Sequence, residues 1–157
     1  MENSSISRIS VLISSQLSFE LTHDQKQLLN YFDDFFHDSN SKKCLVIKGY
    51  AGTGKTTMLG AFVKSLPKFK SKSVLLAPTG RAAKVLSNSA NKKAQTIHKK
   101  IYRQVSNPHS GALSFQRMSN YATNTVFIVD EASMITDESD FGTNSLLTDL
   151  IEYVFTN

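Results

Sequence analysis

The sequence predicts an α/β fold in which a parallel sheet is flanked by helices. Three short apolar runs with high β-propensity, residues 44–48, 74–77 and 125–129, have the length of buried strands. A helical pattern over residues 58–63 separates the first two runs and ends near Pro67, which cannot continue a helix. Strand, helix and strand in this order indicate a parallel pair with a right-handed crossover. A chain of 157 residues can build one such domain around its own core.

A glycine-rich stretch joins the first predicted strand to its helix and matches G-x-x-x-x-G-K-[ST] at residues 49–56. Its glycines have no Cβ, so their backbone can adopt positive φ and approach an anion closely. Successive N–H groups then face phosphates at the positive end of a helix dipole. Lys55 adds a cation for the β and γ phosphates, and the Thr56 hydroxyl is a candidate ligand of Mg²⁺. The alternative is a glycine-rich turn that matches by chance.

Charge is distributed unevenly along the chain, although the net charge is only +5. No Asp or Glu occurs between residues 39 and 129, while 16 of the 18 Lys and Arg residues lie there; only Arg8 and Lys26 lie outside. A basic block of this size indicates a polyanionic partner, most simply nucleic acid held through its phosphates. The alternative is a basic surface that only keeps the protein in solution.

Several classes of protein are disfavoured by composition. The single cysteine, Cys44, excludes a disulfide framework, and we expect it to be a small core residue of the first strand. The four histidines lack the spacing of metal ligands. No apolar run reaches 18 residues, and the N-terminus does not resemble a secretory signal. We therefore expect a cytoplasmic protein with no membrane association.

Residues 1–19 are predicted to form an N-terminal extension, polar and rich in serine, with apolar spacing that could make a weak helix. A stronger helix follows, with Thr22 as its N-cap and Gln25 three residues later, the pattern of a capping box. Gln25 has a second possible role, because a glutamine amide both donates and accepts and can pair with the edge of adenine. The same amide atoms cannot fill both roles at one instant.

The second strand is followed by Pro78, Thr79, Gly80 and Arg81, at the edge of the sheet where ligands bind in open α/β folds. A hydroxyl, free amides at a helix start and a guanidinium form a contact set for phosphate. A plain N-capped helix with a surface arginine explains the same residues. His98 could equally be an ordinary surface or packed histidine. Residues 112–124 are polar and irregular, typical of a loop or a weak hairpin.

Two carboxylates, Asp130 and Glu131, follow the third strand directly. Acids at the end of a buried strand are costly unless they have a task. Beside a phosphate loop, Asp130 would hold Mg²⁺ near Thr56, and Glu131 would orient and deprotonate an attacking water. The alternative is a helix start at which acids favour the dipole. Residues 144–155 predict an amphipathic helix with one core-facing stripe, which consists of Leu146, Leu147, Leu150, Ile151, Val154 and Phe155.

Five motifs in order resemble the RecD-like branch of superfamily 1 DNA helicases over about residues 20–155. They are Leu-Thr-x-x-Gln (21–25), Gly-Tyr-Ala-Gly-Thr-Gly-Lys-Thr-Thr (49–57), Ala-Pro-Thr-Gly-Arg-Ala-Ala (77–83), Thr-Ile-His (96–98) and Val-Asp-Glu-Ala-Ser-Met (129–134). The resemblance implies a P-loop NTPase domain of RecA-like fold that uses ATP and Mg²⁺ to move 5′ to 3′ along single-stranded DNA.

Site roles follow from the resemblance residue by residue. Catalysis would involve Lys55, Asp130 and Glu131, and the metal ligands would be Thr56 and Asp130. The residues expected to bind ATP are Gln25, Gly49, Gly52, Thr53, Gly54, Lys55, Thr56 and Thr57. The residues expected to line the DNA track are Pro78, Thr79, Gly80, Arg81, Thr96 and His98.

The chain departs from the family pattern at its end. A complete motor has two lobes, a Gly-Asp-x-x-Gln sensor segment and arginines from the second lobe, and none of these follows Phe155 here. We therefore expect residues 20–157 to form a partial first lobe that is incomplete at its C-terminal end. It would need a second lobe for unwinding and would be marginally stable or prone to aggregate. The alternatives are a nucleotide- or DNA-binding remnant without turnover and, more remotely, another phosphate-loop enzyme.

Overall fold

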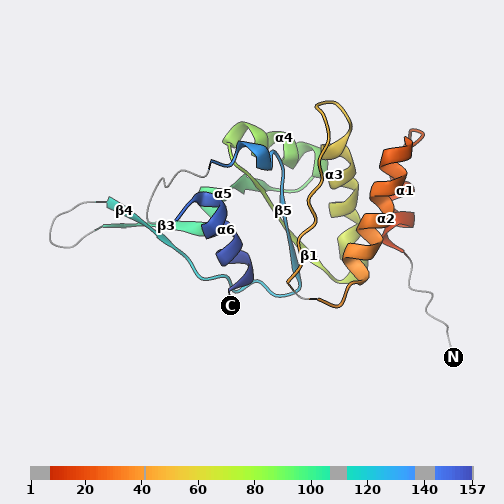
Figure 1. Cartoon of the computed structure of the whole chain (residues 1–157). Coiled ribbons are helices and arrows are strands. Elements are labelled where there is room, and N and C mark those ends of the chain that lie inside the picture. Colours follow the sequence, from red (N-terminus) through yellow and green to blue (C-terminus); the bar gives the residue numbers. More distant parts are fainter. Residues whose placement is uncertain (1–7, 41, 107–112, 137–143, 157) are drawn as a thin grey trace. The chain divides into compact units, whose positions relative to one another are not determined.

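A computed structural model describes residues 8–40, 42–106, 113–136 and 144–156. Their contacts divide the chain into two compact units, residues 1–71 and residues 72–157, and each is described by itself (Figure 1). The first unit contains only helices among its described elements. The second contains every described strand together with three α-helices.

The first unit contains α1 (Ile9–Ser14), α2 (His23–His37), α3 (Lys55–Ser65) and the short 3-10 helix η1 (Leu66–Phe69). Its core forms where α1 packs on α2 and α3. Ile9 and Ile13 of α1 are fully buried, which confirms a short helix in the N-terminal extension. Phe32 of α2 stacks on Phe62 of α3 with ring centroids 4.5 Å apart. These apolar contacts fix the helix that follows the phosphate loop.

The second unit is built on a parallel sheet in the order β2-β1-β5, from β1 (Lys72–Ala77), β2 (Ala94–Thr96) and β5 (Thr125–Val129). The strands expected over residues 74–77 and 125–129 are thus confirmed, and they pair in parallel from Lys72 opposite Thr125 onward. The helices of this unit are α4 (Gly80–Ala90), α5 (Ile97–Ile101) and α6 (Leu146–Phe155), beside the 3-10 helix η2 (Ala132–Met134). The fold is α/β, a parallel sheet flanked by helices, as expected.

The core of the second unit lies between the sheet and helices α5 and α6. Its buried members are Leu76, Ile97, Ile101, Leu146, Leu150 and Tyr153. An antiparallel hairpin of β3 (Tyr102–Ser106) and β4 (Leu113–Arg117) extends away from the sheet of the same unit (Figure 1). Residues 112–124, for which a loop or a weak hairpin was expected, therefore contain one strand of this hairpin, β4. The other strand, β3, precedes that region in the sequence.

Two expectations about elements were wrong. The structure has no strand at residues 44–48; the segment is exposed at alternate residues, with Val46 70% exposed and Cys44 exposed rather than in the core. A strand needs a partner for its ladder, and none of the described strands pairs with this segment. The apolar stripe of α6 was also too wide, because Leu147 and Ile151 are 39% and 49% exposed and Tyr153 is buried instead. None of the described helices is long and apolar enough to cross a membrane.

Candidate nucleotide and nucleic-acid site

The phosphate loop has the backbone that an anion cradle requires. Gly52 and Gly54 lie in the left-handed region, with φ of +77° and +84°, which other residues rarely adopt. Gly54 is the N-cap of α3, and no side chain caps that helix start. The first N–H groups of an α-helix have no carbonyl partner within the helix, and those of α3 lie at the positive end of its dipole. This arrangement is suited to phosphate.

Lys55 lies folded across the loop. Its Nζ donates to the carbonyl oxygens of Gly49 at 2.7 Å and Tyr50 at 2.8 Å. The Thr53 hydroxyl donates to the same Tyr50 carbonyl at 2.8 Å, which closes the turn. An ammonium group has three donors, so Lys55 can also bond an anion while it holds the loop. The site therefore places a cation beside the N-terminal amides of α3.

Gln25 joins α2 to the phosphate loop. The Thr22 hydroxyl accepts from the Gln25 N–H at 3.3 Å, and Gln25 Oε1 accepts from the Thr22 N–H at 3.1 Å, which confirms the capping box. In addition, Gln25 Nε2 donates to the Thr53 carbonyl at 3.1 Å, a contact that the sequence did not indicate across 28 residues. Both ends of this amide thus already have one partner, so pairing with adenine would have to use the second N–H and the second lone pair or replace these contacts. That second role stays a prediction.

Asp130 and Glu131 differ sharply in environment. Asp130 is 7% exposed, its N–H donates to the Leu76 carbonyl at 3.1 Å, and its Oδ1 accepts from the Glu131 N–H at 3.0 Å. Glu131 is exposed and left-handed, with φ of +55°. Its side chain does not cap η2, so a simple helix cap does not explain this acid. A non-glycine residue in this conformation costs about 1–2 kcal/mol, a strain typical of functional sites.

The predicted DNA-contact residues gather at the carboxyl ends of two neighbouring strands. Ala77 of β1 is in register with Thr96 of β2, so the helix starts that follow lie at one edge of the sheet. Thr79 caps α4 by accepting from the Ala82 N–H at 3.2 Å, and Thr96 caps α5 by accepting from the Lys99 N–H at 3.3 Å. Each hydroxyl is an acceptor in its cap and keeps its own proton to donate.

The remaining members of that set differ in exposure. Gly80 and Arg81 are exposed, Pro78 is half-buried, and His98 is half-buried with its ring 5.8 Å from that of Tyr102. The structure therefore confirms the N-capped helix at Thr79 and leaves the Arg81 guanidinium at the surface. The DNA-binding roles stay predictions.

The metal prediction rests on Thr56 in the first unit and Asp130 in the second. Among the described residues, no group of three or more His, Cys, Asp or Glu side chains could hold a metal ion. Mg²⁺ in phosphate-transfer sites is bound by one or two protein oxygens together with substrate phosphates, so such a cluster is not required. A hydroxyl and a buried carboxylate are the oxygen donors that this ion prefers.

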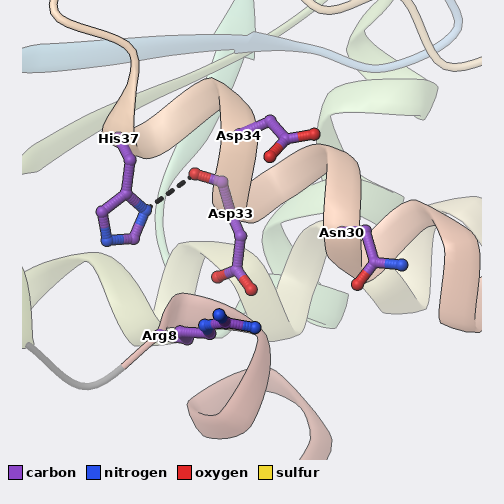
Figure 2. A pocket seen from close by; sticks show the side chains of 5 residues that line it. All are labelled: Arg8, Asn30, Asp33, Asp34 and His37. Atoms are coloured by element: carbon purple, nitrogen blue, oxygen red, sulfur yellow. Dashed lines mark hydrogen bonds between the residues drawn. The ribbon is translucent and has the colours of Figure 1, made fainter.

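One pocket, of about 400 Å³, lies outside every predicted site and is lined by Arg8, Asn30, Asp33, Asp34 and His37 (Figure 2). The Asp33 carboxylate accepts from the Ser10 N–H at 3.0 Å and from its hydroxyl at 2.6 Å. His37 Nδ1 lies 2.8 Å from the Asp33 carbonyl oxygen. Asp33 thus satisfies the start of α1 from a neighbouring helix, which explains this acid structurally.

Comparison with known proteins adds two findings. A protein-family model described as an AAA domain matches residues 20–144. The ATP-dependent DNA helicase dda of Enterobacteria phage T4 is 32% identical over 117 residues, which cover 73% of this chain and 26% of that helicase. The residues that the family model matches include both the phosphate loop and the Asp130–Glu131 pair of this chain. The chain matches about a quarter of the length of this curated relative.

Proposed function

Because the chain belongs to the AAA-domain family of P-loop NTPases related to DNA helicases, we propose that it binds and hydrolyses ATP as part of a motor that moves on single-stranded DNA. The observation that carries the proposal is the phosphate loop. Two left-handed glycines, an uncapped helix start and the Lys55 ammonium converge on one backbone cradle. No other described segment combines these features.

The loop residues divide the work of binding. Backbone amides at the start of α3 hold the β and γ phosphates, and Lys55 neutralises their charge while it keeps one or two loop carbonyls as partners. Gln25 sets the loop conformation through Thr53 and contacts adenine when its amide exchanges partners. Thr56 and Asp130 would hold Mg²⁺, which supplies charge neutralisation on the transferred phosphate.

Glu131 is the residue that we assign to the attacking water. Its carboxylate is exposed, with no capping bond to η2, so it can accept the proton of a water that attacks the γ phosphate. Asp130 fixes the backbone amide of Glu131 through its Oδ1. The adjacent acids thereby take different tasks, one buried and bonded, the other exposed and ready to accept a proton.

Single-stranded DNA is the proposed polyanion. The Thr79 and Thr96 hydroxyls and the exposed Arg81 lie at one edge of the sheet and would donate to its phosphates. The acid-free basic stretch supports this independently. Helicase movement requires two lobes that change their spacing with nucleotide state. We therefore also propose that these 157 residues alone do not unwind duplex DNA.

Two variants separate the proposed roles. Lys55→Ala removes the cation of the cradle and should abolish binding of ATP, measured with a fluorescent ATP analogue. Glu131→Gln keeps size and hydrogen bonding but cannot take a proton, so it should bind ATP like the wild type and lose turnover by at least about 100-fold. Equal hydrolysis by Glu131→Gln and wild type would contradict the assignment of this acid.

The competing function is a binding module that holds nucleotide or DNA without turnover. It shares the need for Lys55, because the cradle is the same. It does not need Glu131. ATP binding without measurable hydrolysis by the wild type, under conditions where DNA also binds, would favour that module over the motor.

A further inference from the structure

The second unit contains a basic pocket that none of the predicted sites includes. Its volume is about 260 Å³, and its lining consists of Ser73, Val74, Leu75, Lys93, Gln95 and Lys100. We call it the lysine pocket. No carboxylate lines it, and all of its members lie within the stretch from residue 39 to residue 129 that has no Asp or Glu.

Ser73, which lines the lysine pocket, is held by a bond from Lys92 in the turn after α4. Helix α4 ends at Asn91, which is left-handed with φ of +48°, and the Lys92 N–H then donates to the Ser87 carbonyl at 3.1 Å. This turn aims Lys92 back at the sheet, where its Nζ donates to the Ser73 hydroxyl at 2.6 Å. Ser73 is only 8% exposed. Because its oxygen accepts from an ammonium, its own O–H is free to donate into the pocket.

Lys93 and Lys100 line the lysine pocket, and among the described residues neither side chain has a structural contact that would explain it. Lys92 is accounted for by its bond to the Ser73 hydroxyl. In the described part of the chain, neither Lys93 nor Lys100 pairs with a carboxylate. Lys93 is exposed and Lys100 is half-buried, and both long, flexible cationic side chains line the pocket, so both can reach an anion bound there. Gln95 lines it as well, and its amide is a further donor.

The position of the pocket relates it to the proposed DNA track. Residues 94–96 form β2, an edge strand, with Lys93 immediately before it and Thr96 at its carboxyl end. Three residues of a strand span about 10 Å. Nucleotides of one strand rise about 3.4 Å each in duplex DNA and more in an extended single strand, so this distance corresponds to roughly one to three nucleotides. A DNA strand that leaves Thr96 along this edge therefore reaches the lysine pocket.

We propose that the lysine pocket binds a backbone phosphate of single-stranded DNA and so extends the track along the edge of β2. Lys93 and Lys100 supply the charge, and Ser73 and Gln95 supply neutral donors. The inference rests on the proposed function, because it takes the same DNA as its ligand. It adds a contact that is independent of the nucleotide site and of the helix starts at Thr79 and Thr96.

The test is binding of a fluorescent oligothymidylate to the full chain, by anisotropy, over a range of salt concentrations. The double variant Lys93→Ala with Lys100→Ala is compared with a control that loses the same charge from two exposed lysines outside the pocket, Lys42→Ala with Lys68→Ala. The pocket variant should raise Kd by roughly tenfold at low salt. It should also reduce the magnitude of the slope of log K against log salt by about 0.7, the value for one lost phosphate contact with a single strand. The control should change both quantities much less.

The outcomes distinguish this inference from the function on which it rests. If the wild type binds the oligonucleotide and the two double variants behave alike, the lysine pocket is not a DNA contact. If the pocket variant loses affinity only for duplex DNA, the assignment to single strands is overturned. If the wild type binds ATP but no DNA, the proposed DNA motor fails and this inference with it. Circular dichroism of both variants confirms that each remains folded.

Discussion

Gly54 is needed in the phosphate loop for two separate reasons. Its φ of +84° lies in the left-handed region, and a Cβ there would come within 3.0 Å of Gln25 Nε2. Gly80 is a matched control, because it also begins a helix but has no positive φ, and a Cβ at this position would have nothing within 4 Å. A side chain at residue 54 would therefore meet both an unfavourable φ and a close neighbour, whereas a side chain at residue 80 would meet neither.

Gly54→Ala should destabilise the chain by about 1–2 kcal/mol and weaken binding of ATP, because the backbone strain adds to the displacement of Gln25. Gly80→Ala should change stability by no more than about 0.5 kcal/mol and leave nucleotide binding unchanged. Urea denaturation and titration with a fluorescent nucleotide measure the two effects. Equal behaviour of the two variants would show that the loop geometry is not what the glycine provides.

Gln25 acts through two ends of one amide, and these ends can be separated. Gln25→Glu keeps an acceptor for the Thr22 N–H, so the capping box survives, but it removes the donor to the Thr53 carbonyl. We expect unchanged stability and weaker ATP binding for this variant. Gln25→Ala loses both contacts and should cost about 0.5–1 kcal/mol in addition. Thermal unfolding measures the stability of the two variants, and titration with nucleotide measures their affinity for ATP. If Gln25→Glu binds ATP as tightly as the wild type, the contact to Thr53 does not shape the loop.

Among elements, α1 depends on an acid from another helix of its unit. The helix has six residues, too few to be stable alone, and Asp33 of α2 bonds both the N–H and the hydroxyl of Ser10. Asp34, the next residue, lines the same pocket without such a bond to α1 (Figure 2). Ile9 and Ile13 of α1 are buried, so the bonds from Asp33 support a helix that contributes to the core of its unit.

Asp33→Ala should therefore cost about 1–3 kcal/mol, because hydrogen bonds to a charged group are lost, and α1 should become sensitive to protease. Asp34→Ala removes the same charge and should stay within about 0.5 kcal/mol of the wild type. Limited proteolysis with identification of the first cleavage site provides the readout. Cleavage of α1 at equal rates in both variants would refute the role given to Asp33.

Sequence patterns predicted those elements that carry their own local signals. The capping box at Thr22, the glycine loop and the runs that became β1 and β5 each depend on neighbouring residues. The wrong predictions concern segments whose structure depends on contacts with distant parts of the chain. Residues 44–48 have the composition of a strand but no ladder partner among the described strands, and the buried face of α6 follows Leu146, Leu150 and Tyr153 because of what packs against it.

For the candidate site, too, local motifs could be predicted from the sequence, whereas contacts between distant residues could not. The phosphate-loop residues were predicted from residue type and spacing, since the chemistry of such a loop is local, and the other site residues from the resemblance to a helicase family; their roles stay predictions. The bond from Gln25 to Thr53 and the lysine pocket were not, because both depend on residues that folding brings together over long stretches of chain. The left-handed backbone of Glu131 also had no sequence signal, as glutamate does not favour that conformation.

At the scale of the whole molecule, the second unit leaves apolar surface exposed. Ile151 of α6 is 49% exposed, and β5 is an edge strand of the described sheet. Exposed apolar helix faces and open sheet edges favour association between chains. We predict that these two surfaces are where copies of the chain would associate; the expected tendency to aggregate stays a prediction.

Ile151→Lys should reduce self-association, measured by light scattering against protein concentration, with little loss of stability because the position is half exposed. Gln104→Lys adds the same charge on the exposed face of β3 and removes no apolar surface, so it should help less. If Gln104→Lys suppresses association as well as Ile151→Lys does, net charge rather than the face of α6 governs solubility.

We propose that this chain couples an ATP site to single-stranded DNA. The most direct test is the steady-state rate of ATP hydrolysis by the full chain in the presence of Mg²⁺, with and without an oligothymidylate. We predict hydrolysis that rises when the oligonucleotide is added and is lost in Lys55→Ala. Hydrolysis that is present but indifferent to DNA at every concentration, or absent while ATP and DNA both bind, would contradict it.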